Sequence, residues 1–218
     1  MPPQTAIEEL EVVETSGGTT GPPPGGGDDG GDAGRGKPAT PRSAYFTGLS
    51  LGLVGILMFF MALTSAFIVR KGLGNDWRAV ELPPVLWVNT LVLLASSATA
   101  ETARRHLARY WYASFNRWWG ITTLLGVLFV AGQLIAWRQL VDAGVYLASN
   151  AASSFFYLLT AAHGVHLLGG MTALLYVRAR RWGAAHARQQ LAADLTAMYW
   201  HFMDGLWVFV LLLLYLGR

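Results

Sequence analysis

The chain has no cysteine among its 218 residues and few charged side chains. The absence of cysteine excludes disulfide bonds, thiolate metal sites and a cysteine nucleophile, and it leaves the redox compartment undetermined. Charged residues make up 13% of the chain and hydrophobic residues 53%. This balance is far from that of a soluble domain and indicates a protein that crosses a membrane several times. No part of the sequence resembles a nucleic-acid-binding face, so no nucleic acid partner is expected.

The first 43 residues lack an apolar face that could be buried. The stretch TSGGTTGPPPGGGDDGGDAGRGKPATPRS is rich in glycine, proline and small polar residues, a composition typical of disordered segments. A cleaved signal peptide is not expected, because the tail lacks a basic region followed by an apolar core of about 7–15 residues. The sequence therefore predicts a disordered tail over residues 1–43, with a short helix or docking peptide in the acidic start EELEVVE as the alternative.

Five apolar segments follow, and each is close to the ~20 residues that cross a hydrocarbon layer of ~30 Å. They cover about residues 44–69, 84–103, 119–136, 151–177 and 195–216. Because a lipid-exposed backbone must satisfy its own hydrogen bonds, all five are expected to be helices. The connections are too short for a second soluble domain. We therefore predict an all-α membrane helix bundle with five transmembrane helices over residues 44–218.

Basic residues are distributed unevenly between the two sides of this arrangement, and that distribution predicts its orientation. One side holds eleven of them: Arg35, Lys37, Arg42, Arg104, Arg105, Arg109, Arg117, Arg178, Arg180, Arg181 and Arg188. The other side holds five: Arg70, Lys71, Arg78, Arg138 and Arg218. The first side, with the N-terminus, is therefore expected to be cytoplasmic, and the C-terminus periplasmic.

Ionisable side chains inside the predicted spans are costly in a bilayer and form the candidate site, a buried polar cluster. Its five members are Glu101, His163, His166, His201 and Asp204. The motif HGVH places His163 and His166 on one face of the fourth helix, and YWHFMDGLW gives His201 and Asp204 the same spacing on the fifth. The two histidines of the fourth helix are either a metal or haem ligand pair or histidines hydrogen-bonded within the bundle.

The other members of the cluster also have two interpretations. His201 and Asp204 either lock two helices together or transfer protons. Glu101 either pairs with Arg105 at the membrane interface, as its spacing of four residues favours, or turns inward towards His166 or His201. Sequence alone does not fix the rotation of the second helix, so both alternatives stay open.

Small residues and arginines suggest two further kinds of contact. Glycine, alanine and serine on the first two spans predict close helix packing, within the chain or against another subunit: Gly48, Gly52, Gly55, Ala95, Ser96 and Ser97. Five arginines near the predicted cytoplasmic interface are candidate contacts for lipid headgroups: Arg104, Arg105, Arg178, Arg180 and Arg181. Ordinary control of topology is the alternative role for these arginines.

Four motifs together resemble subunit III of the haem-copper oxidases, the cytochrome c and quinol oxidases that reduce oxygen. They are NTLVLLASS at residues 89–97, DAGVY at 142–146, AAHGVHLLGG at 161–170 and YWHFMDGLWVFVLLLLYL at 199–216. Their order and spacing match the family along the whole hydrophobic region. The five spans correspond to the last five of the seven-span members, as in the short form common in bacteria.

The resemblance implies an accessory subunit of a proton-pumping terminal oxidase in the bacterial cytoplasmic membrane. Such a subunit binds no haem or copper of its own, since these lie in partner subunits. It packs directly against the catalytic subunit I, in a complex with subunit II and other subunits, and holds phospholipid between its helix groups. It stabilises the oxygen-reducing subunit and supports proton uptake. The electron donor, cytochrome c or quinol, is set by other subunits.

The chain departs from the family pattern at one position of the first span. Many relatives carry a buried glutamate there, whereas GLVGILMFFMALTSAF has Ile56. A role that depends on that carboxylate does not transfer to this chain. Glu101 lies on a different span and matches the carboxylate that short bacterial members often carry after the LLASS stretch.

Two other functions compete with this interpretation. A stand-alone membrane protein that binds haem b or a metal would use His163, His166 and His201, which lie on two helices at comparable depth. A Soret band retained by the isolated chain would favour it. A transporter is disfavoured because no span is interrupted at mid-membrane and no inverted repeat is visible.

Overall fold

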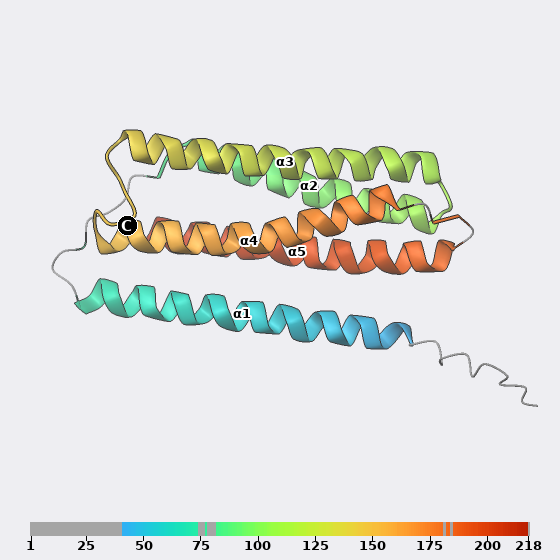
Figure 1. Ribbon diagram of the computed structural model, residues 1–218, viewed down its shortest axis with the longest axis horizontal. Helices are drawn as coiled ribbons and strands as arrows, with labels where there is room; N and C mark the ends of the chain where they lie inside the picture. The colour runs from blue at the N-terminus through green and yellow to red at the C-terminus, as the bar shows by residue number, and fades with distance from the viewer. Residues whose placement is uncertain (1–40, 74–76, 78–81, 181, 184, 218) are drawn as a thin grey trace, which may run out of the picture. The chain divides into compact units, whose positions relative to one another are not determined.

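The computed structural model describes residues 41–73, 77, 82–180, 182–183 and 185–217. Within these ranges the chain forms five α-helices and no strand (Figure 1). They are α1 (Arg42–Leu73), α2 (Val85–Ala108), α3 (Tyr112–Asp142), α4 (Ala151–Ala179) and α5 (His186–Leu216). All five are long and apolar enough to cross a membrane. The predicted all-α fold with five spans is therefore confirmed.

Several helices extend beyond the apolar segments that predict them. For example, α3 has 31 residues and α5 also has 31. At about 1.5 Å per residue such helices measure roughly 46 Å, more than the ~30 Å hydrocarbon layer. Hydropathy marks only the part of a helix that lies in hydrocarbon, because polar residues continue the helix through the headgroup region. Residues 1–40 of the predicted tail lie outside the described residues, and the orientation of the termini stays a prediction.

Helices α2 to α5 form a four-helix bundle in which each helix contacts two of the others. The contacts run from α2 to α3, from α3 to α4, from α4 to α5 and from α5 back to α2. Helix α1 packs along α4 and α5, on the other side of that pair from α3 in Figure 1. Two antiparallel neighbours, α2 and α3, are joined by a connection of only three residues.

Tryptophan side chains fill the bundle interior and bond one helix to the next. The Trp200 Nε1 of α5 donates to Ser96 Oγ of α2 at 2.9 Å, and Trp207 Nε1 donates to Thr90 Oγ1 at 3.0 Å. Both rings are almost completely buried. An indole combines a large apolar surface with one N–H group that needs an acceptor when it is buried. These two hydrogen bonds therefore join α5 to α2 at two levels.

The contact between α2 and α3 depends on a glycine. The Asn89 Nδ2 of α2 donates to the Phe129 carbonyl of α3 at 2.9 Å. Gly132, three residues further along α3, faces the same amide, and a Cβ at this position would overlap Asn89 Oδ1. The missing side chain lets the short asparagine reach the backbone of its neighbour.

We expect Gly132→Ala to destabilise the protein by about 1–3 kcal/mol, because the added methyl group must displace a buried, hydrogen-bonded side chain. The free energy of unfolding in mixed detergent micelles measures this. Gly205→Ala is the matched control, since a Cβ at Gly205 meets no atom within 4 Å. Equal stability of the two variants would contradict the packing described for Asn89.

Candidate functional site

An ion-pair cluster joins three helices at the end of the bundle where α1 and α5 begin and α2 ends. Its members are Arg42, Glu101, Arg104, Arg105 and Asp194. Asp194 of α5 pairs with Arg42 of α1, and its Oδ1 lies 3.4 Å from Arg104 Nη1 of α2. Glu101 accepts from Arg104 Nε at 2.8 Å and from Arg105 Nε at 2.8 Å. The cluster therefore attaches α1 to the four-helix bundle through charge.

Asp194 is the central member of this ion-pair cluster. Its side chain is only 8% exposed, whereas that of Arg42 is 61% exposed. Gln190, one turn earlier, donates to Asp194 Oδ1 at 3.1 Å. Because Arg42 is largely solvated, its ion pair with Asp194 is screened by water and contributes only modestly to stability. The buried carboxylate needs these partners more than the exposed arginine does, since an unpaired buried charge is costly.

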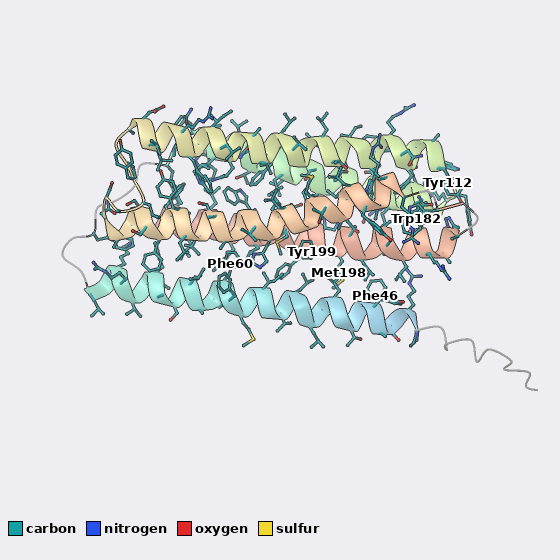
Figure 2. The ribbon with its side chains drawn as sticks, in the orientation of Figure 1. Phe46, Phe60, Tyr112, Trp182, Met198 and Tyr199 are labelled. Atoms are coloured by element: carbon teal, nitrogen blue, oxygen red, sulfur yellow. The ribbon has the colours of Figure 1, made fainter. Side chains whose placement is uncertain are left out.

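A groove of about 420 Å³ lies beside the ion-pair cluster, and we call it the charged groove. Its lining combines acidic, basic and apolar side chains from three helices: Arg42, Phe46, Glu101, Arg104, Asp194, Ala197, Met198 and His201. Figure 2 shows Phe46 and Met198 between α1 and α5. Carboxylates, guanidinium groups and one imidazole thus meet at the predicted cytoplasmic end of the bundle.

His201 lies two turns of α5 deeper than Asp194 and is bonded to α2. Its Nδ1 lies 2.5 Å from Ser97 Oγ. The preceding residue, Trp200, bonds to Ser96, so two successive residues of α5 meet two successive residues of α2. These bonds fix the rotation of α5 and hold the imidazole at the wall of the charged groove.

Asp204 lies one turn beyond His201 and is 3% exposed. Neither of its carboxyl oxygens forms a hydrogen bond of normal geometry within the described part of the chain. Ser97, the partner of His201, is the polar side chain near this carboxyl group. An ionised carboxylate without partners is costly inside a bilayer, so this residue is held there by the surrounding fold and not by an ion pair.

The two histidines of α4 have different surroundings. His163 is 1% exposed, and its ring lies 5.2 Å from the Trp207 ring and 6.2 Å from the Phe129 ring, measured between centroids. Its ring nitrogens have no hydrogen-bond partner among the described residues. His166 bonds through Nδ1 to the Ala162 carbonyl of its own helix at 2.8 Å.

His166 also contributes to the contact of α4 with α1 and α5. Its ring packs edge-on against Phe60 of α1, with 5.8 Å between centroids, and its carbonyl accepts from the Tyr199 hydroxyl of α5 at 2.8 Å. In Figure 2, Phe60 and Tyr199 lie in the layer between α1 and the α4–α5 pair. His163 thus faces the interior of the four-helix bundle, whereas His166 faces α1.

The five predicted site residues do not form one hydrogen-bonded cluster in the described structure. Glu101 forms no hydrogen bond to His166 or His201 there, and the partner of His201 is Ser97. Glu101 adopts the interfacial alternative and pairs with Arg105 and also with Arg104. Glu101 and His201 nevertheless line the same groove.

The described residues contain no group of three or more histidine, aspartate or glutamate side chains that could hold a metal ion. The three histidines proposed as ligands in the competing interpretation have different surroundings. His201 bonds to a serine of α2, His166 bonds to its own helix, and His163 packs between aromatic rings. The geometry therefore offers no preformed metal centre in this part of the chain.

The predicted headgroup arginines differ in what they contact. Arg104 and Arg105 hold Glu101, and Arg178 donates to the Asn116 carbonyl of α3 at 2.9 Å. Arg180 stacks on the Trp182 ring, with its guanidinium carbon 4.8 Å from the centroid. Arg181 lies outside the described residues. Arg105 and Arg180 are exposed and keep surface available for an anionic headgroup.

Two members of the ion-pair cluster, Arg42 and Asp194, are not among the predicted site residues, and Asp194 is the central one. Two signals could have identified it. It is an acidic residue immediately before the fifth apolar segment, and it lies seven residues before His201, which places both on one face of a helix. Hydropathy alone assigns such a position to the interface, where an acidic residue is unremarkable. Its partner on α1 could not be foreseen, because that requires the order of helices in space.

Comparison with known proteins gives a consistent result. Residues 42–217, which include all five helices, match the family described as cytochrome c oxidase subunit III. A protein of Mycobacterium tuberculosis named probable cytochrome c oxidase subunit 3 is 34% identical over 171 residues, covering 74% of this chain and 82% of that protein. One of Nocardia farcinica with the same name is 34% identical over 176 residues, covering 78% and 87%. A Bacillus protein named cytochrome c oxidase subunit 3 is 30% identical over 177 residues, covering 78% and 84%.

We expect Asp194→Asn to weaken the attachment of α1, because Arg42 and Arg104 then lose their shared carboxylate. The loss should be about 1–2 kcal/mol, a value reduced for the exposure of Arg42. Thermal unfolding of the purified protein measures it, and Arg117→Gln, which removes an exposed charge of α3, is the control. Unchanged stability of the Asp194 variant would remove Asp194 as the centre of the ion-pair cluster.

Proposed function

Because the chain belongs to the cytochrome c oxidase subunit III family, and so is an accessory subunit of a haem-copper oxidase, we propose that it stabilises the catalytic subunit I and performs no redox step itself. The family match over all five helices carries this proposal. In it, haem and copper lie in partner subunits, and this chain contacts subunit I directly within a complex that includes subunit II. The electron donor is cytochrome c, with quinol as the alternative.

The outward face of α1 is the proposed contact with subunit I. Only four of its 32 residues are buried: Leu53, Phe60, Thr64 and Phe67. Gly48, Gly52 and Gly55 are exposed, and a Cβ at each would meet no described atom within 4 Å. Small residues allow another transmembrane helix to approach closely, which is how helices associate in a membrane without a hydrophobic driving force.

The small residues of α2 have a different role from those of α1. Ser96 accepts from Trp200, and Ser97 lies at hydrogen-bond distance from His201, so both are used within the chain. Ala95 is exposed. The small residues were predicted to pack either within the chain or against another subunit, and the two helices differ in this respect. The serines of α2 pack internally, and the glycines of α1 are available to a partner.

The charged groove supports a second part of the proposal, assistance to proton uptake. It brings three titratable side chains, Glu101, Asp194 and His201, to one end of the bundle. The excess of basic residues predicts that this end faces the cytoplasm of a bacterium, from which a proton-pumping oxidase takes its protons. Exposed arginines there, such as Arg105 and Arg180, are proposed contacts for phospholipid headgroups.

We expect Gly55→Leu to weaken association with subunit I roughly five- to tenfold, because the side chain prevents close approach of the partner helix. The open space around Gly55 means that the chain itself still folds. The amount of subunit I that co-purifies with the tagged chain in detergent measures the effect. Gly205→Leu, an exposed glycine on α5 with equal space, is the control. Full co-purification of the Gly55 variant would refute the assignment of this face.

Removal of this chain from the purified oxidase should slow proton uptake and reduce the number of turnovers before the enzyme inactivates. Adding the chain back should restore both quantities. Stopped-flow detection of proton uptake, with oxygen consumption followed to inactivation, measures them. If the depleted enzyme matches the intact one in both, the chain has no supporting role in the reaction. A Soret band retained by the isolated chain would instead favour the competing haem-binding function.

A further inference from the structure

Two hollows between α3 and α4 join into one groove at the opposite end of the bundle from the charged groove. The deeper hollow has a volume of about 240 Å³ and reaches down to Phe129. The shallower one has a volume of about 290 Å³ and is bordered by Arg138 and Asp142. Leu134 and Trp137 line both hollows, so the two are continuous. We call the combined feature the α3–α4 groove.

The walls of the α3–α4 groove are mostly apolar. The polar atoms of Trp137 and Tyr157 are bonded within the chain, whereas the buried side-chain amide of Gln133 has no hydrogen-bond partner among the described residues. Trp137 Nε1 donates to Thr160 Oγ1 at 3.2 Å, and the Tyr157 hydroxyl donates to the Val145 carbonyl at 2.8 Å. These bonds fix both rings and leave their apolar surfaces to the groove. On the α4 side, Val165 is 68% exposed, so that rim of the groove lies at the surface of the bundle.

The mouth of the α3–α4 groove carries one cation and one anion. Arg138 and Asp142 are both exposed and border the same hollow, yet neither forms an ion pair with a described residue. A basic residue four positions before an acidic one is the less favourable order for a pair within a helix. One helical turn separates them by about 6 Å along the axis, so a positive charge lies deeper in the membrane and a negative charge lies further out.

The length of the α3–α4 groove matches one leaflet of a bilayer. From Asp142 to Phe129, thirteen positions of α3 span roughly 20 Å at 1.5 Å per residue. Half of the ~30 Å hydrocarbon layer together with one headgroup region is also about 20 Å. A molecule that fills the groove therefore has a polar head at Arg138 and Asp142 and an apolar chain that descends towards Phe129 and Gly164.

We propose that the α3–α4 groove binds one phospholipid with a zwitterionic headgroup that ends in a primary ammonium, the phosphatidylethanolamine class. Its phosphate, the deeper charge, lies at Arg138, and its ammonium, the outer charge, donates to Asp142. One acyl chain occupies the groove down to Gly164, where a Cβ would meet no described atom within 4 Å. Phosphatidylglycerol lacks the cation, and the quaternary ammonium of phosphatidylcholine cannot donate a hydrogen bond.

This site is independent of the proposed contact with subunit I and of the charged groove. It lies at the end of the bundle where α3 ends and α4 begins, whereas the four described headgroup arginines lie towards the other end: Arg104, Arg105, Arg178 and Arg180. The assignment of lipid class follows from the order of the two charges along α3. It therefore holds whichever side of the membrane this end faces.

A photoreactive phosphatidylethanolamine with a diazirine in one acyl chain tests the site in the purified oxidase complex. We expect labelling of peptides that contain residues 129–142 and 157–168. Unlabelled phosphatidylethanolamine should compete about tenfold better than phosphatidylglycerol. Exchange of the two charges in the double variant Arg138→Asp/Asp142→Arg keeps the net charge and reverses their order, so labelling should fall about tenfold. Arg138→Gln alone should lower it about threefold.

Matched controls separate this proposal from its alternatives. Arg117→Gln removes an exposed arginine of α3 at the opposite end, and it should leave the labelling unchanged. Gly164→Leu should lower the labelling about fivefold by filling the groove, whereas Gly205→Leu should not. Equal competition by phosphatidylglycerol, or full labelling of the charge-exchanged variant, would overturn the proposal. A photo-crosslinking residue at Leu168 that captures another subunit instead of lipid would also overturn it, since a protein segment would then occupy the groove.

Discussion

A buried polar group inside a bilayer has no water to bond with, and this constraint organises the contact between α5 and α2. Trp200 and Trp207 each bury a large ring in the bundle, and each indole N–H needs an acceptor on another helix. Ser96 and Thr90 of α2 supply these acceptors. The two hydrogen bonds set the rotation and register of α5. The positions of the other polar residues on that helix follow from them.

With the rotation of α5 fixed in this way, its side chains Asp194 and His201 line the charged groove. Asp194 lies two turns before His201 and reaches the arginines of α1 and α2, while His201 meets Ser97. Helix α1 is held less extensively, through Arg42 at its start and through Phe60 against His166 near its middle. A helix held on one face leaves its other face for a partner. An accessory subunit of a larger complex requires such a face.

The sequence was sufficient to predict the helices but not their partners. Five apolar segments of the right length define five spans, because hydropathy is a local property of each segment. Glu101 had two predicted partners: Arg105, four residues away on the same helix, or a histidine on another helix. The local ion pair with Arg105 was foreseeable from a spacing of four residues, whereas the serine that bonds His201 depends on the register of α2 against α5. Asp194 was missed for the same reason.

The energy of the hydrogen bond between Ser96 and Trp200 tests most directly whether interhelical hydrogen bonds position α5. A double-mutant cycle with Ser96→Ala and Trp200→Phe, read as the free energy of unfolding in mixed detergent micelles, isolates the energy of this one contact from the loss of ring packing. The account predicts a coupling energy of about 1 kcal/mol, as for other interhelical hydrogen bonds in membranes. A coupling energy of zero would contradict it, because α5 would then be positioned by apolar packing alone.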